Sequence, residues 1–317
     1  MYQTSIAHPG WFVTRRTLSL GFLVVMAAAA AALWTPDRDR ALLETRYLRA
    51  ASDLRVIDNV SLHVRDDGPR TAPALIMLHG LGSSLHTWEP WAKSLATEFR
   101  VIRLDLPGSG LSAPDPGGDY TDARSHSLIK ALMDSLDVSR ATLIGNSMGG
   151  RIAWSFAARS PDRVDKLVLI SPDGFASPGF AYDRAAEVPA SLSLLRYMLP
   201  TWTLRMSLKP AYAQPERLTD STVTRYHDLL LAPGARDAML QRMRQTVLTD
   251  PLPRLASIVA PTLILWGEKD AMIPVSNAAD YVAAIRGARL VTLPDGGHVP
   301  FEESPAASLD AVRAFLR

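Results

Sequence analysis

A serine between two glycines is the feature of this sequence most directly suited to chemistry. Ser147 lies in the run Gly-Asn-Ser-Met-Gly over residues 145–149, after an apolar stretch that ends at Ile144 and before an amphipathic stretch. A serine on a tight strand-to-helix turn needs small neighbours, because its backbone is strained and its hydroxyl must protrude. Gly145 and Gly149 provide that room. The spacing predicts that Ser147 is a nucleophile rather than a residue that only caps a helix.

A histidine must accompany such a serine, because a hydroxyl becomes a good nucleophile only when a base removes its proton. On strand-to-helix serine turns the chain order is serine, acid, histidine, which leaves His227 and His298 among the seven histidines. His298 follows the last strand-like run and is predicted to be the base, whereas His227 lies in a helical stretch and is expected on its surface. His79 precedes the serine and is expected to hold its own loop by hydrogen bonds.

An acid must orient the imidazole and stabilise its protonated form. Asp270 comes just after the strand-like run 262–266 and is the first choice. Asp173, which follows an earlier strand-like run, is the rival, since its carboxylate could reach the histidine from there. Glu268 and Glu302 are interpreted as a solvated turn residue and a helix N-terminal acid.

Backbone amides could stabilise the oxyanion that such a serine generates. The loop over residues 79–84 is rich in glycine and serine, and the amides of Leu81 and Met148 are the predicted donor pair. The turn over residues 105–110 lacks nucleophile spacing and is interpreted as structural. No cluster has metal-ligand spacing and no glycine-rich phosphate loop is present, so neither a metal nor a cofactor is predicted.

Short aliphatic runs that alternate with amphipathic stretches must position these residues. The pattern is typical of an α/β domain with a mostly parallel sheet flanked by helices. Eight runs are predicted strands: 54–58, 61–65, 74–78, 101–104, 141–144, 166–170, 262–266 and 290–293. Five stretches are predicted helices: 88–98, 122–136, 148–159, 276–286 and 306–317.

One long segment interrupts this rhythm. Residues 176–255 contain no strand-like run but many aromatic, leucine and methionine residues at loosely helical spacing. The segment is too long and too apolar for a loop. It is predicted to be a helical cap over the carboxyl edge of the sheet, which leaves residues 37–175 and 256–317 as the core.

The first 36 residues form a separate hydrophobic segment. Residues 17–36 carry no formal charge, and a helix of about 20 residues can cross a hydrocarbon core. Arg15 and Arg16 precede this stretch, and Trp11 and Trp34 flank it. This pattern predicts a single membrane anchor with the catalytic body outside the cytoplasm, in the periplasm or extracellular space. The alternative is a cleaved export signal that releases a soluble protein.

Charge and composition exclude several classes of protein. The chain of 317 residues has 34 basic and 32 acidic residues, and the surplus of two is Arg15 and Arg16. The body is therefore neutral overall, which argues against a nucleic-acid partner. The absence of cysteine excludes disulfides, thiolate metal sites and cysteine nucleophiles.

These motifs together resemble the serine-nucleophile branch of the α/β-hydrolase superfamily, across about residues 54 to 317. The resemblance rests on five segments in family order: 79–82, 105–110, 145–150, 266–270 and 297–302. Ser147 argues against the dehalogenase and epoxide-hydrolase branches, which have aspartate at that position. The turn 145–150 is similar to that of the meta-cleavage carbon–carbon hydrolases, but those relatives tend to have tryptophan where this chain has Val299.

The resemblance implies a serine hydrolase, and a carboxylic-ester hydrolase of apolar small-molecule esters is the first hypothesis. A carbon–carbon hydrolase is the alternative; it would need a cationic or polar group from the cap, for which Arg196 or Arg205 is available. A non-catalytic binding member of the fold is a third possibility, although such members usually have a broken triad. The sequence does not specify the substrate or the oligomeric state.

Overall fold

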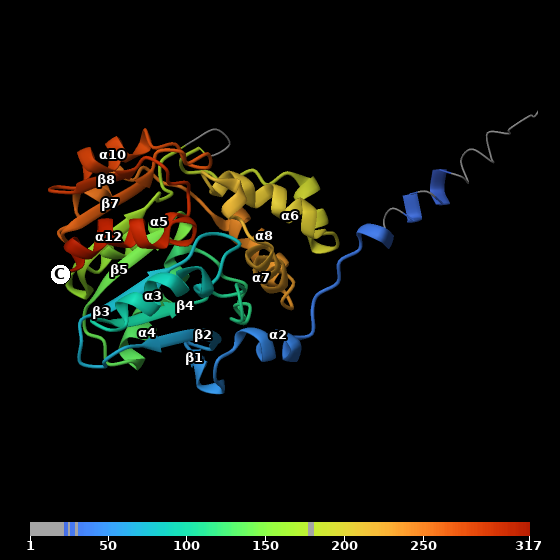
Figure 1. The fold of residues 1–317 in the computed structure, drawn as a ribbon, viewed down its shortest axis with the longest axis horizontal. Coiled ribbons are helices and arrows are strands. Elements are labelled where there is room, and N and C mark those ends of the chain that lie inside the picture. The colour runs from blue at the N-terminus through green and yellow to red at the C-terminus, as the bar shows by residue number, and fades with distance from the viewer. Residues whose placement is uncertain (1–21, 25, 29–30, 177–180) are drawn as a thin grey trace, which may run out of the picture.

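An eight-stranded, mostly parallel sheet organises the chain (Figure 1), as predicted. The computed structural model describes residues 22–24, 26–28, 31–176 and 181–317. The strands, in spatial order, are β1 (Leu54–Ile57), β2 (Val60–Asp67), β4 (Arg100–Leu104), β3 (Ala74–Leu78), β5 (Ala141–Asn146), β6 (Val164–Ile170), β7 (Thr262–Gly267) and β8 (Arg289–Leu293). The β1–β2 and β2–β4 pairs are antiparallel, and all later pairs are parallel.

The central strands are apolar on both faces because helices cover both sides of the sheet. All five residues of β3 are buried. Ile76 and Leu78 belong to the core on one face, whereas Leu75 and Met77 belong to the core on the other. This alternation explains why the run has no polar position.

Helices cover the two faces in separate groups. One face packs against α4 (Asp122–Ser135), α5 (Met148–Arg159), α9 (Leu252–Ala256) and α10 (Asn277–Ala284). The other packs against α3 (Glu89–Leu95), α11 (Pro300–Glu303) and α12 (Pro305–Leu316). Short 3-10 turns connect these elements: η1 (Ala51–Asp53), η2 (Leu85–Trp88) and η3 (Pro161–Arg163). The predicted layered α/β architecture is confirmed.

Helices also dominate the segment between β6 and β7, here called the cap (residues 176–255). It contains α6 (Thr201–Leu208), α7 (Asp220–Leu230), α8 (Ala235–Gln245) and the turns η4 (Ala190–Arg196), η5 (Lys209–Ala211) and η6 (Pro215–Arg217). Figure 1 shows α6, α7 and α8 grouped together to one side of the sheet. The domain boundaries remain predictions.

The segment before the first strand packs on the cap through a helix that the sequence did not predict, α2 (Arg40–Tyr47). The Tyr47 hydroxyl donates to Asp228 Oδ2 at 2.6 Å, and Arg46 forms an ion pair with the same carboxylate. None of the helices among the described residues has the length and apolarity needed to cross a membrane. The predicted anchor over residues 17–36 lies partly outside the described residues.

Candidate active site

The serine turn has the strained geometry that its glycines suggested. Ser147 has φ 53° and ψ −123° between β5 and α5, a backbone conformation that is uncommon outside glycine. A Cβ at Gly145 would lie 2.2 Å from the Gly149 carbonyl oxygen, and a Cβ at Gly149 would lie 2.3 Å from that of Leu78. Side chains are therefore excluded at both positions, and Ser147 is placed at the carboxyl edge of the sheet.

The predicted base and acid are in contact. His298 Nδ1 donates to Asp270 Oδ2 at 2.8 Å, and both residues are buried. Asp270 Oδ1 accepts the amides of Met272 and Ile273 at 2.8 and 2.9 Å. Burial alone would raise the pKa of Asp270, but the hydrogen bond and charge of His298 outweigh it and hold that pKa below its ordinary value. An ionised Asp270 can stabilise a protonated His298.

The rival acid is engaged elsewhere. The Asp173 carboxylate forms an ion pair with Arg151 Nε at 3.1 Å. Its backbone carbonyl accepts hydrogen bonds from the side chains of Trp154 and Tyr281. The structure therefore brings Asp270, and not Asp173, to His298.

Ser147 and His298 line one cavity of about 620 Å³ at the sheet edge. The neighbouring Asn146 holds the two segments together, because its Nδ2 donates to the carbonyl oxygens of Ile170 at 3.1 Å and His298 at 2.9 Å. The cavity thus exposes a hydroxyl and an imidazole to the same bound molecule. The shared cavity agrees with the predicted roles of a serine nucleophile and a histidine base.

The loop after β3 passes directly beside the serine. A Cβ at Gly80 would lie 3.2 Å from Asn146 Oδ1 and 3.4 Å from Ser147 Cβ, so the loop backbone lies close to the serine turn. Leu81 and Met148, the predicted oxyanion donors, both line the cavity. Met148 is the first residue of α5, where backbone N–H groups have no partner within the helix.

His79 holds this loop by hydrogen bonds of its side chain, as expected. Its Nδ1 donates to the Gly80 carbonyl at 2.7 Å, and its Nε2 accepts the Leu106 amide at 3.1 Å. Burial lowers its pKa, which favours the neutral ring that this bonding needs.

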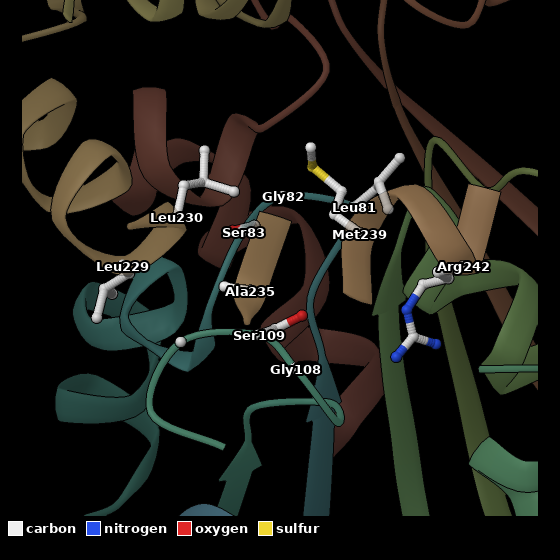
Figure 2. A pocket seen from close by; sticks show the side chains of 11 residues that line it. Leu81, Gly82, Ser83, Gly108, Ser109, Leu229, Leu230, Ala235, Met239 and Arg242 are labelled. Carbon is white, nitrogen blue, oxygen red and sulfur yellow. The ribbon is translucent and has the colours of Figure 1, made fainter. Parts of the chain in front are cut away.

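A second, much smaller cavity is also lined by this loop (Figure 2). Its volume of about 10 Å³ is enough for about one water molecule and excludes an organic substrate. Helix α8 forms one wall through Met239 and Arg242. Arg242 Nη2 donates to the Pro107 carbonyl at 3.0 Å, so the cap is fixed to the core next to the loop that carries Leu81.

Among the described residues, three charged side chains line the large cavity: Arg151, Asp173 and Glu187. Arg151 pairs with Asp122 at 2.6 Å as well as with Asp173. The guanidinium is thus already neutralised by two carboxylates. Most other lining residues are apolar or small, including Leu208, Val188, Phe175 and Ile273.

Several polar roles differ from the sequence-based expectations. His227 was expected on a helix surface but is buried, and its Nε2 hydrogen-bonds the Leu199 carbonyl at 2.7 Å. Glu302 lies in the first turn of α11, in agreement with its interpretation as a helix N-terminal acid, and its carboxylate also joins the cap to the core, as described below. Arg196 and Arg205 pair with cap aspartates and do not line the cavity. Within the described ranges, no group of three His, Asp or Glu side chains could hold a metal ion.

A family model for the alpha/beta hydrolase fold matches residues 73–305. The chain belongs to the α/β-hydrolase superfamily. The match covers the serine turn, the acid and the histidine, and it confirms the predicted family and an enzyme of the hydrolase class.

Proteins similar to this hydrolase have names that point to different substrates. A 2-hydroxy-6-oxononadienedioate/2-hydroxy-6-oxononatrienedioate hydrolase from Paraburkholderia xenovorans is 32% identical over 255 residues, which cover 75% of this chain and 84% of that protein. An enol-lactonase from Burkholderia xenovorans has a TM-score of 0.71 at 26% identity, covering 83% of this chain and 99% of the other. A bacterial membrane phospholipase A has a TM-score of 0.71 at 26% identity, covering 95% of this chain and 98% of the other.

Proposed function

We propose that this hydrolase cleaves carboxylic esters of apolar substrates through an acyl-enzyme intermediate. Ser147 Oγ attacks the ester carbonyl carbon, and His298 Nε2 takes the hydroxyl proton while Asp270 holds the imidazole. The amides of Leu81 and Met148 donate to the oxyanion of the tetrahedral intermediate. Collapse expels the alcohol, which receives the proton from His298. A water molecule, activated by the same base, then releases the acid and restores Ser147.

The charge of the cavity wall is the observation that carries the choice of an ester substrate. Arg151 is already paired with Asp122 and Asp173, and Glu187 adds a further negative charge to the lining. Among the described lining residues, no lysine or arginine is free of a carboxylate partner, so a substrate carboxylate bound there would lose water without gaining a cation, which is unfavourable. A neutral ester needs no such partner and is compatible with the apolar lining.

The alternative is a carbon–carbon hydrolase, which the Paraburkholderia xenovorans relative supports by sequence. The dienedioate in the name of that protein is a dicarboxylate. The cationic cap residues suggested for this role, Arg196 and Arg205, pair with Asp237 and Asp220 and lie outside the cavity lining. We therefore rank this activity second.

The N-terminal segment is proposed to anchor the enzyme in a membrane, with the body in the periplasm or outside the cell. Arg15, Arg16 and the uncharged stretch 17–36 support this placement. The membrane phospholipase A covers 95% of this chain, compared with 83% for the enol-lactonase, so its similarity extends further along the chain. Lipid esters are therefore included among the proposed substrates. A mature N-terminus near residues 30 to 35, detected by mass spectrometry, would instead support a cleaved signal.

A substrate panel tests the proposal. The full chain is assayed on p-nitrophenyl esters of increasing acyl length, on phosphatidylcholine vesicles and on a 2-hydroxy-6-oxo-dienoate, with Ser147→Ala as the control. We expect ester hydrolysis with a higher kcat/KM than dienoate cleavage, and loss of both with the control. A dienoate kcat/KM above that of every ester would establish the carbon–carbon alternative.

A further inference from the structure

A buried carboxylate joins the cap to the core beside the cavity. The Glu302 side chain on α11 is only 8% exposed, yet it accepts hydrogen bonds from four side chains. The donors are Thr87 at 3.0 Å, Tyr212 at 3.1 Å, Tyr226 at 2.9 Å and Arg225. Three of these four donors belong to the cap, so this carboxylate forms hydrogen bonds with chain segments that are distant in sequence.

Tyr226 differs from the other donors because its hydroxyl has a second partner. It donates its proton to Glu302 Oε2, so the hydrogen bond of 3.3 Å between its oxygen and Ser83 Oγ must be donated by Ser83. Burial and the charge of Glu302 raise the pKa of Tyr226. The phenol therefore stays protonated and keeps this direction of bonding over the working pH range.

The two hydrogen-bond partners of Tyr226 lie on two segments of the candidate active site: the loop that carries Leu81 and the segment that carries His298. Ser83 closes a turn in the loop over residues 79–84, here called the oxyanion loop, since its amide donates to the Gly80 carbonyl at 3.3 Å and Leu81 lies inside that turn. Figure 2 shows Leu81 and Ser83 on this loop. Glu302 lies four residues after His298. Tyr226 itself lines the same cavity as Ser147.

The cap also contacts the histidine segment through its backbone. The His298 amide donates to the Ala211 carbonyl at 2.8 Å. Glu303 Oε2 accepts the Gly297 amide at 2.9 Å, and its Oε1 accepts the Gln214 amide of the cap at 2.7 Å. The segment around His298 thus has several attachments to the cap, and the Tyr226 hydroxyl forms hydrogen bonds both to Glu302 of this segment and to Ser83 of the oxyanion loop.

We propose that Tyr226 is a positioning residue that sets the oxyanion loop relative to His298 through its hydrogen bonds to Ser83 and Glu302. This proposal rests on the ester-hydrolase function proposed above. The Leu81 amide helps catalysis only when it points at the position of the developing oxyanion, because that interaction is made in the transition state. Loosening the loop should therefore lower kcat and leave KM nearly unchanged.

Tyr226→Phe removes the hydroxyl and keeps the ring, and Tyr212→Phe is its matched control. Each variant removes one phenol donor to Glu302, but among the hydrogen bonds of the described residues one joins Tyr226 to Ser83 and none joins Tyr212 to Ser83. We expect Tyr226→Phe to lower kcat for p-nitrophenyl butyrate about tenfold, less than the loss for deleting an oxyanion donor outright, with KM within about twofold. Tyr212→Phe should keep both constants within about twofold, while the two variants lose similar thermal stability.

Ser83→Ala provides a second test, because it removes the other partner of the Ser83–Tyr226 hydrogen bond. It should reproduce the kcat loss, and the double variant with Tyr226→Phe should show no further loss. Equal kinetic effects of Tyr226→Phe and Tyr212→Phe would overturn the proposal. So would additive losses in the double variant, or an effect of Tyr226→Phe confined to KM, which would make Tyr226 a substrate contact. A wild type that does not hydrolyse esters would overturn the proposed function. An active wild type whose kinetics are unaffected by Tyr226→Phe and Ser83→Ala would overturn only the positioning role of Tyr226.

Discussion

Asp270→Asn tests whether Asp270 orients His298, because the surrounding hydrogen bonds fix which way the asparagine side chain points. Asp270 Oδ1 accepts the amides of Met272 and Ile273, whereas Oδ2 accepts His298 Nδ1. An asparagine must keep its oxygen toward the two amides, so its NH2 group faces the histidine. Nδ1 then has to accept, and the ring proton moves to Nε2. This tautomer cannot take the proton of Ser147.

We expect a large loss of kcat in Asp270→Asn because the substitution changes the tautomer of His298, while the fold is retained. In triads of this kind the wrong tautomer lowers kcat by about 10⁴-fold, which corresponds to a barrier increase of about 5.4 kcal/mol. The two hydrogen bonds that the side chain accepts from the amides of Met272 and Ile273 survive in the proposed orientation. Stability should therefore fall by only about 1–2 kcal/mol.

The assay compares kcat for p-nitrophenyl butyrate in Asp270→Asn and Asp173→Asn, with melting temperatures as the folding control. Asp173→Asn weakens the ion pair to Arg151 without touching His298, so we expect less than about a tenfold loss of kcat. The reasoning is refuted if a folded Asp270→Asn keeps more than about a tenth of the wild-type kcat, or if Asp173→Asn loses as much activity as Asp270→Asn.

Two further predictions concern stability. Gly149→Ala should destabilise the fold by more than about 2 kcal/mol, because its Cβ would lie 2.3 Å from the Leu78 carbonyl oxygen. Gly117→Ala is the control, since its Cβ would meet only a side-chain atom, at 3.2 Å. Equal urea midpoints for the two variants would contradict this prediction. Asp105→Asn should cost about 3 kcal/mol at pH 7, because the buried carboxylate accepts from His63 and two backbone amides. Burial opposes ionisation of Asp105, but its hydrogen bond to His63 lowers its pKa to about 2, below the value of about 3.9 in an unfolded chain. Its ionised form therefore stabilises the fold above about pH 4, and that contribution is lost as the pH falls toward 2; a stability gap between wild type and Asp105→Asn that does not narrow in acid would count against the assignment.

Much of the core could be predicted because its strands are continuous apolar runs bounded by turns. The runs 74–78 and 141–144 are buried on both faces and match β3 and the start of β5. The same logic located the reactive residues. In a parallel sheet the strands end at one edge, so Ser147 after β5 and Asp270 after β7 approach each other without being near in sequence.

The polar contacts of the cap could not be predicted, because they depend on tertiary packing rather than on local pattern. Glu302 lies in the first turn of the short helix α11, as expected for an N-terminal acid, but no sequence signal indicated that its partners come from positions 87, 212, 225 and 226. His227 carries no sequence signal that distinguishes a buried from an exposed histidine. Arg151 follows the serine by one helical turn, and this spacing could have placed it in the cavity wall.

The central claim is that Ser147 is a nucleophile activated by His298, and covalent labelling tests it most directly. The full chain is treated with a fluorophosphonate, and the modified peptide is identified by mass spectrometry. We predict one adduct, on Ser147, whose formation is abolished in Ser147→Ala and strongly slowed in His298→Ala. A folded wild-type protein that forms no adduct on Ser147, or that is labelled equally fast in His298→Ala, would contradict the account.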